Sequence, residues 1–175
     1  EAKVPEDVTF ATKPQLAQKM LERAFLAGLS VAFVTGATVY GDDQALRQSL
    51  QKRRQSYVLA LPTDARPGWQ EAQIRPQTLA RPPPASDWHT PPCGAAAQGL
   101  RRSDWACLAL DAPTQEGFGP WLLSRRSLTD ATELAYVLVF APLNKLLGTM
   151  LREAATRGTI DAVTWNTRGE VALDV

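Results

Sequence analysis

The chain has 175 residues, a length that fits one domain or a domain with an inserted lobe. Hydrophobic residues at 45% and charged residues at 21% argue against disorder. The net charge of +1 gives no overall field that would attract nucleic acid, so any DNA contact has to come from local clusters. No apolar run approaches the roughly 20 residues of a membrane span, so we expect a cytoplasmic protein with no membrane partner.

The first expected element is a helix that begins after residue 12. Thr12 can cap it, and Pro14 suits its first turn. Apolar residues then recur at helical spacing until Gly28 ends the pattern. The side chains expected on the core face of this helix are Leu16, Met20, Leu21, Ala24 and Phe25.

Two buried strands are expected next. Residues 31–35, VAFVT, are an unbroken β-branched and aromatic run, as in a strand covered on both faces. Residues 57–61, YVLAL, have the same character. A helical pattern lies between them with short connections, which predicts parallel pairing through a right-handed crossover and hence an α/β layer.

The helix between these strands can be capped by Asp42 or Asp43. Leu46 and Leu50 lie one turn apart and are expected to face the core, whereas Arg47 is expected to face elsewhere. The paired acids could also be ligands of Mg²⁺, a hard ion that takes carboxylate oxygens. The sequence favours the cap, because Asp at a helix N-terminus accepts a backbone N–H and suits the helix dipole.

The character of the chain changes after residue 61. Proline-rich runs at 81–85 and 90–93 break regular structure and indicate a long loop. The strands expected after this loop are 105–110, 120–124 and 134–140, and the expected helices are 145–156 and 160–168. The first two of these strands are predicted to form an antiparallel hairpin.

Three pairs of adjacent arginines are candidates for phosphate contact. They are Arg53 with Arg54, Arg101 with Arg102, and Arg125 with Arg126. Guanidinium groups bind phosphate well, although most exposed arginines are simply solvated. No phosphate-binding Walker loop, dinucleotide-binding glycine motif or zinc protease motif occurs. The residues by themselves therefore indicate a soluble α/β domain.

A series of sequence blocks carries a resemblance to a known family. The blocks are FATKPQLAQKMLERA at 10–24, FVTGATVYGDD at 33–43, YVLAL at 57–61, SDW at 103–105, WLLSRRSLTD at 121–130, TELAYVLVFAP at 132–142, TRGTID at 156–161, RGEV at 168–171 and LD at 173–174. In this order and at this spacing, they resemble the catalytic core of bacterial insertion-sequence transposases of the DDE superfamily. The resemblance covers nearly the whole chain.

The resemblance implies a partial ribonuclease-H-like core with a β-strand-rich insertion, within the α/β class. Residues 1–61 would be the first α/β part of the core, residues 62–142 the insertion with its proline-rich loop, and residues 143–175 the C-terminal helical part. In such enzymes two Asp and one Glu hold two Mg²⁺ ions, which activate the attacking group and stabilise the leaving oxygen at a DNA phosphodiester. The first Asp is expected on a strand upstream of Glu1.

The resemblance also assigns positions to the other functional residues. The second Asp belongs just after the first strand, where this chain has Ala37. The Glu belongs on the late helix, one turn past Arg157, where this chain has Asp161. The later basic residue of the family is Arg168. Any DNA affinity, weak or vestigial, is expected to come from Arg53, Arg54, Arg125, Arg126 and Arg157.

These replacements predict the loss of catalysis. A methyl group cannot coordinate Mg²⁺, and Asp161 reaches about 1.5 Å less far than Glu. We therefore expect a degenerate transposase core that holds no metal cofactor of its own. The Cβ atoms of Ala37 and Asp161 should lie within roughly 10 Å of each other, because the acids they replace share metal ions.

Two alternatives stay open. One is an active transposase that takes ligands from Asp42, Asp43 or an upstream segment. The other is a repurposed small-molecule enzyme that uses the space between Ala37 and Asp161. The sequence also leaves a homodimer open.

Overall fold

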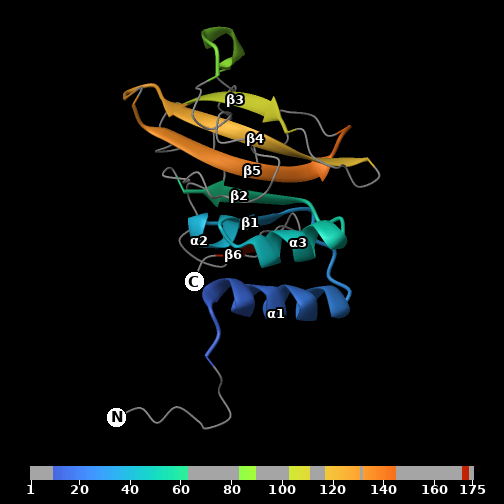
Figure 1. The fold of residues 1–175 in the computed structure, drawn as a ribbon. Helices are drawn as coiled ribbons and strands as arrows, with labels where there is room; N and C mark the ends of the chain where they lie inside the picture. Colours follow the sequence, from blue (N-terminus) through green and yellow to red (C-terminus); the bar gives the residue numbers. More distant parts are fainter. Residues whose placement is uncertain are drawn as a thin grey trace, which may run out of the picture.

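The computed structural model describes residues 10–62, 83–89, 103–110, 117–130, 132–144 and 171–173. The helices are α1 (Lys13–Leu26), α2 (Thr38–Gly41) and α3 (Gln44–Lys52), with a 3-10 turn η1 (Ala85–Asp87), and the strands are β1 (Val34–Gly36), β2 (Tyr57–Leu61), β3 (Ser103–Ala109), β4 (Phe118–Ser127), β5 (Leu134–Pro142) and β6 (Val171–Leu173). The strands form one mixed sheet in the order β3-β4-β5-β2-β1-β6. Figure 1 shows α2 and α3 on one face of β1 and β2, and α1 at the β6 end of the sheet.

Helix α1 begins where the sequence predicts. The Thr12 side-chain oxygen accepts the Gln15 N–H at 3.4 Å, and the Gln15 side chain accepts the Thr12 N–H at 2.8 Å. This reciprocal capping box satisfies two backbone donors at the start of the helix. The chain leaves the helix through Gly28, whose φ of +76° is a conformation that glycine adopts without strain.

The predicted core face of α1 was wrong for two residues. Leu16 and Met20 are 49% and 46% exposed, whereas Pro14, Ala17 and Leu21 are buried. Apolar residues occur on both sides of this helix, so periodicity alone does not select the buried side. The compact side chains of Pro14 and Ala17 let α1 approach its neighbours closely, and the longer Leu16 and Met20 side chains take the outer side.

The parallel pairing of the first two strands is confirmed. β1 pairs with β2 in the register Val34 to Tyr57, and helices α2 and α3 form the crossover between them. β1 begins three residues later than predicted, at Val34, whose N–H donates to the Ser56 carbonyl at 2.9 Å. β2 begins at Tyr57, as predicted, and follows a turn at Arg54, whose φ is +53°. The earlier residues of the expected first strand therefore lie outside this ladder.

The later strands form an antiparallel meander. β3 pairs with β4, and β4 pairs with β5, so the predicted hairpin is confirmed and extended by a third strand. β5 also pairs with β2 in an antiparallel register, with Leu138 opposite Leu59. The antiparallel strands therefore continue the sheet of the parallel pair, across the expected boundary at residue 61.

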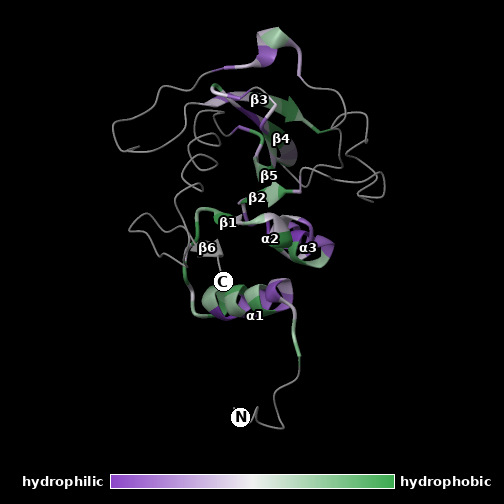
Figure 2. Ribbon diagram, turned by 90° about the vertical axis from the view of Figure 1, so that its left-hand side faces the viewer, coloured by the Kyte–Doolittle hydropathy of each residue, from purple (hydrophilic) through white to green (hydrophobic). Residues whose placement is uncertain are grey.

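Two apolar clusters hold the sheet. The cluster on the helical side contains Tyr57, Leu59 and Phe140 together with buried residues of α1 and α3. The Phe140 ring stacks on Tyr57 and on Phe118, with centroids 5.6 and 5.4 Å apart. The other cluster includes Trp105 of β3. Figure 2 shows hydrophobic residues along the central strands and hydrophilic ones on α3 and part of α1.

Several expectations fall outside the described residues. The helices predicted at 145–156 and 160–168 are among them, and so is most of the proline-rich loop. The described piece near the C-terminus is β6, which pairs in parallel with β1 through Val171 and Val34. Among the helices that the structure describes, none is both long and apolar enough to cross a membrane.

Candidate active site

The candidate site lies at the carboxyl ends of the parallel strands. Gly36, the last residue of β1, is in register with Leu59 of β2 and Leu173 of β6, so these strands run toward the same edge of the sheet. Ala37 follows Gly36 directly. In open α/β sheets, ligands bind outside the carboxyl ends of the strands. The position that the family resemblance assigns to a catalytic Asp is therefore at the edge where function is expected.

Ala37 begins the short helix α2. Its φ of −72° and ψ of 178° are those of an N-cap, and its carbonyl accepts the N–H groups of Tyr40 at 2.9 Å and Gly41 at 3.1 Å. The half-buried methyl group makes no capping hydrogen bond. Asp is among the preferred N-cap residues, so the backbone at Ala37 is one that an aspartate would suit.

The turn from β1 into α2 is fixed by close packing. A Cβ atom on Gly41 would overlap the carbonyl oxygen of Ala60 in β2. A Cβ atom on Gly36 would lie 2.8 Å from Leu59 Cδ2 and 3.1 Å from Tyr40 Cβ. Tyr40 itself is buried. These contacts hold Ala37 at a defined place relative to β2 whether or not any chemistry takes place there.

The cap interpretation of the paired acids is confirmed for Asp43. Its Oδ1 accepts the Leu46 N–H at 2.7 Å at the start of α3. Leu46 and Leu50 are buried as predicted. The prediction for Arg47 was wrong, because this side chain is only 2% exposed and its Nη1 donates to the Gly41 carbonyl. The buried guanidinium thus ties α3 to the end of α2, a role that apolar periodicity does not reveal.

The described residues at this edge do not fit a two-metal centre. Ala37 has no side-chain donor atom, and the Asp43 carboxylate accepts a backbone N–H of α3. Within the ranges that the structure describes, no three His, Cys, Asp or Glu side chains gather to hold an ion. Asp161 and Arg168 lie outside these ranges, so the expected approach of Asp161 to Ala37 stays a prediction.

The structure separates the arginines expected to contact DNA. Arg126 makes an ion pair with Asp104 at 2.9 Å, and its guanidinium lies 4.4 Å from the ring centroid of Trp88. Arg125, the preceding residue of β4, faces the other side of the sheet because side chains alternate along a strand. Arg126 therefore contributes to attachment of the 83–89 segment to the sheet.

The other expected DNA contacts lie elsewhere. Arg53 and Arg54 are exposed at the end of α3, which lies between β1 and β2 in the chain, whereas Arg125 and Arg126 belong to β4. Arg157 is outside the described residues. The structure thus brings Arg53 and Arg54 together, and it does not place them beside Arg125 and Arg126.

The chain is thus an α/β domain in which the turn from β1 into α2 places residue 37 at the carboxyl ends of the parallel strands. A family model described as DDE superfamily endonuclease matches residues 1–112, which is more than half of the chain. The chain therefore belongs to the DDE superfamily endonuclease family, and its mixed sheet is compatible with a ribonuclease-H-like fold. No curated protein and no solved structure gives a significant match.

Proposed function

We propose that this chain is a catalytically inactive derivative of a bacterial insertion-sequence transposase core that retains DNA contact in the cytoplasm. Membership of the DDE superfamily endonuclease family supports the nuclease lineage. The observation that carries the loss of activity is Ala37, a methyl-bearing residue held at the carboxyl end of β1.

The chemistry explains why this one position matters. In two-metal phosphoryl transfer, carboxylates place two ions that stabilise the attacking and leaving oxygens. Most of the catalytic effect comes from charges that are already positioned where negative charge develops. A side chain without a donor atom at the centre of the site removes that positioning, even though the surrounding fold is kept.

The cap at Asp43 bears on one form of the active alternative, the form that takes a metal ligand from Asp43. An active enzyme that used Asp43 would have to release its carboxylate from the Leu46 N–H, which it accepts at 2.7 Å. Loss of an N-cap costs about 1 kcal/mol, and Asp43 comes after the C-terminal end of α2, whereas Ala37 is at its N-terminal end. No described contact favours the small-molecule alternative.

Mn²⁺ binding tests the proposal directly. We expect the unmodified chain to leave Mn²⁺ free in an electron paramagnetic resonance titration, with no site tighter than about 1 mM. The variant Ala37→Asp should bind Mn²⁺ more tightly than Thr38→Asp, the matched control that adds the same charge one residue later. Two Mn²⁺ ions bound per unmodified chain below that limit, and lost in Asp43→Asn, would contradict the proposal.

A further inference from the structure

Helix α1 carries two apolar faces. Pro14, Ala17 and Leu21 form the buried one. Leu16 and Met20 lie on the outer side, one turn apart, and are 49% and 46% exposed. A surface helix of a globular protein ordinarily has one apolar stripe, which faces the core. The core therefore accounts for the first face and does not account for the second.

The outer face has the spacing at which helices pack against each other. Its exposed members recur at intervals of four, three and four residues, and they are Leu16, Met20, Arg23 and Ala27. At about 100° per residue they lie within an arc of about 60°. These intervals are those of the a and d positions that a second helix covers. We call this set of residues the outer seam of α1.

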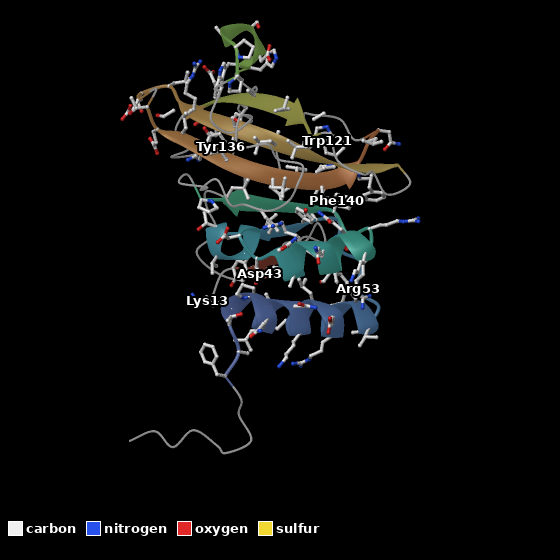
Figure 3. The ribbon with its side chains drawn as sticks, in the orientation of Figure 1. Lys13, Asp43, Arg53, Trp121, Tyr136 and Phe140 are labelled. Atoms are coloured by element: carbon white, nitrogen blue, oxygen red, sulfur yellow. The ribbon has the colours of Figure 1, made fainter. Side chains whose placement is uncertain are left out.

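The outer seam is turned away from the rest of the fold. Figure 3 shows α1 as the outermost element of the helical layer, with side chains extending from the side that faces away from α2 and α3. The buried residues Ala17 and Leu21 lie about 120° around the helix from the middle of the seam. A second helix could therefore approach the seam without displacing the core contacts of α1.

Cations accompany the outer seam. Arg23 belongs to it, and Lys19 directly precedes Met20, at a position that flanks the seam and carries charges in paired helices. Both cations are exposed. The one acid of α1, Glu22, lies about 60° farther around the helix than Lys19, and its carboxylate accepts the Gln18 side-chain amide at 3.2 Å. The seam is therefore apolar in part and positively charged beside its apolar residues.

Helix stability does not select these side chains. Leu and Met favour a helix about as strongly as Lys, Gln and Glu do, so an exposed position gains no helix propensity from an apolar residue. A cation in the last turn complements the helix dipole, which explains Arg23, but Lys19 is in the middle of α1, where the dipole has little effect. Single exposed apolar residues are ordinary on protein surfaces. Leu16 and Met20 differ because they are neighbours on one seam beside two cations.

We propose that the outer seam of α1 docks an amphipathic helix of a protein partner, and that Asp and Glu residues flank the apolar stripe of that helix. The apolar stripe covers Leu16 and Met20, and the carboxylates pair with Lys19 and Arg23. The inference goes beyond the proposed function and does not depend on it.

The charges exclude a second copy of this chain as the occupant. In a two-fold contact a surface meets itself, so Lys19 and Arg23 of both copies would share one interface and repel each other. Nucleic acid supplies phosphates for the cations but leaves Leu16 and Met20 uncovered. A membrane takes up an apolar face buried about 5 to 10 Å deep, which the two half-exposed apolar side chains of the seam do not supply.

The test is the binding of fluorescein-labelled synthetic peptides to the full chain, measured by fluorescence anisotropy at low salt. The first peptide has about three heptads, with Leu at positions a and d and Glu at positions e and g. The second has Lys in place of each Glu, and the third has the composition of the first with the Leu spacing scrambled. The unmodified chain should bind the first peptide about tenfold more tightly than either of the others.

Two double replacements separate the apolar contribution from the charged one. Leu16→Gln with Met20→Gln keeps good helix formers and should weaken binding of the first peptide by about tenfold, because the apolar contact is lost. Lys19→Glu with Arg23→Glu should reverse the preference, so that the Lys peptide binds more tightly than the Glu peptide. Circular dichroism establishes that each variant is folded.

The matched control makes the same apolar-to-polar change at another place. Leu128 and Leu143 are 46% and 54% exposed, and both lie outside α1. Leu128→Gln with Leu143→Gln should alter the affinity for the first peptide by less than about threefold, because distant sites act independently. Lys19→Arg with Arg23→Lys keeps the charges and should keep the affinity.

Several outcomes would overturn the inference. They include no binding of the first peptide, equal binding of the Glu and Lys peptides, and an equal loss of affinity in the matched control. Self-association in analytical ultracentrifugation that Leu16→Gln with Met20→Gln abolishes, without peptide binding, would assign the seam to a second copy. Binding to phosphatidylserine vesicles or to a DNA duplex in place of the peptide would assign it to a membrane or to nucleic acid. Loss of catalysis is judged separately, by metal binding and strand cleavage.

Discussion

Replacing Gly41 by alanine is expected to lower the free energy of unfolding by about 3 kcal/mol, at the upper end of what overpacking costs. The new Cβ atom would overlap the Ala60 carbonyl oxygen, which belongs to β2 and has little freedom to move. α2 would have to shift away from the strand. Urea denaturation with far-ultraviolet circular dichroism as the signal measures the change.

Gly28→Ala is the matched control for this variant. Gly28 has nothing within 4 Å of a new Cβ atom, and its φ of +76° makes alanine unfavourable by about 1 kcal/mol.

Alanine favours a helix over glycine by about 1 kcal/mol. If α2 did not press against β2, Gly41→Ala would therefore raise the stability, and a rise or no change would contradict the described packing.

Truncation of Leu21 to alanine should cost between about 2 and 4 kcal/mol, while the same truncation at Leu16 should cost less than about 1 kcal/mol. Both residues are in α1, but Leu21 is 3% exposed and packs in the cluster on the helical side, whereas Leu16 is 49% exposed. Because the chemical change and the helix are the same, the difference between the two variants measures burial alone.

The comparison of Leu21 and Leu16 also tests which face of α1 is buried. Equal losses of stability at the two positions, or a larger loss at Leu16, would mean that α1 is rotated relative to its described orientation. Urea denaturation of both variants under the same conditions provides the measurement.

The sequence predicts the parallel core well because each of its signals is local. The capping box at Thr12 and the Asp43 cap each depend on residues within one turn. The apolar run at 57–61 matches β2 from end to end. A short crossover between two buried strands leaves little choice but parallel pairing. These features need no information about distant parts of the chain.

Features that depend on contacts between elements were not predictable in this way. The choice between the two apolar sides of α1 is made by its neighbours. Arg47 was expected on the surface because arginine usually lies there, yet it is buried with its Nη1 donating to the Gly41 carbonyl. Gly41 gave a signal in principle, since a glycine two residues before the helix cap at Asp43 suggests close approach of the backbone.

The candidate site also combines features that the sequence predicts with features that it does not predict. The place of Ala37 at the carboxyl end of β1 follows from strand, turn and helix signals that the sequence carries, together with the resemblance at 33–43. The ion pair of Arg126 with Asp104 and its contact with the Trp88 ring could not be predicted in this way. They depend on the register of β3 against β4 and on a loop that is distant from Arg126 in the sequence.

Cleavage of supercoiled plasmid in the presence of Mg²⁺ or Mn²⁺ is the most direct test of the lost active site. We expect no nicking by the unmodified chain, because Ala37 supplies no ligand atom, and none by Ala37→Asp with Asp161→Glu, because these two carboxylates by themselves hold a second ion poorly. Asp161→Ala, purified in parallel, reports any contaminating nuclease. Metal-dependent nicking by the unmodified chain that Asp161→Ala or Asp43→Asn abolishes would contradict the account and identify the chain as an active transposase.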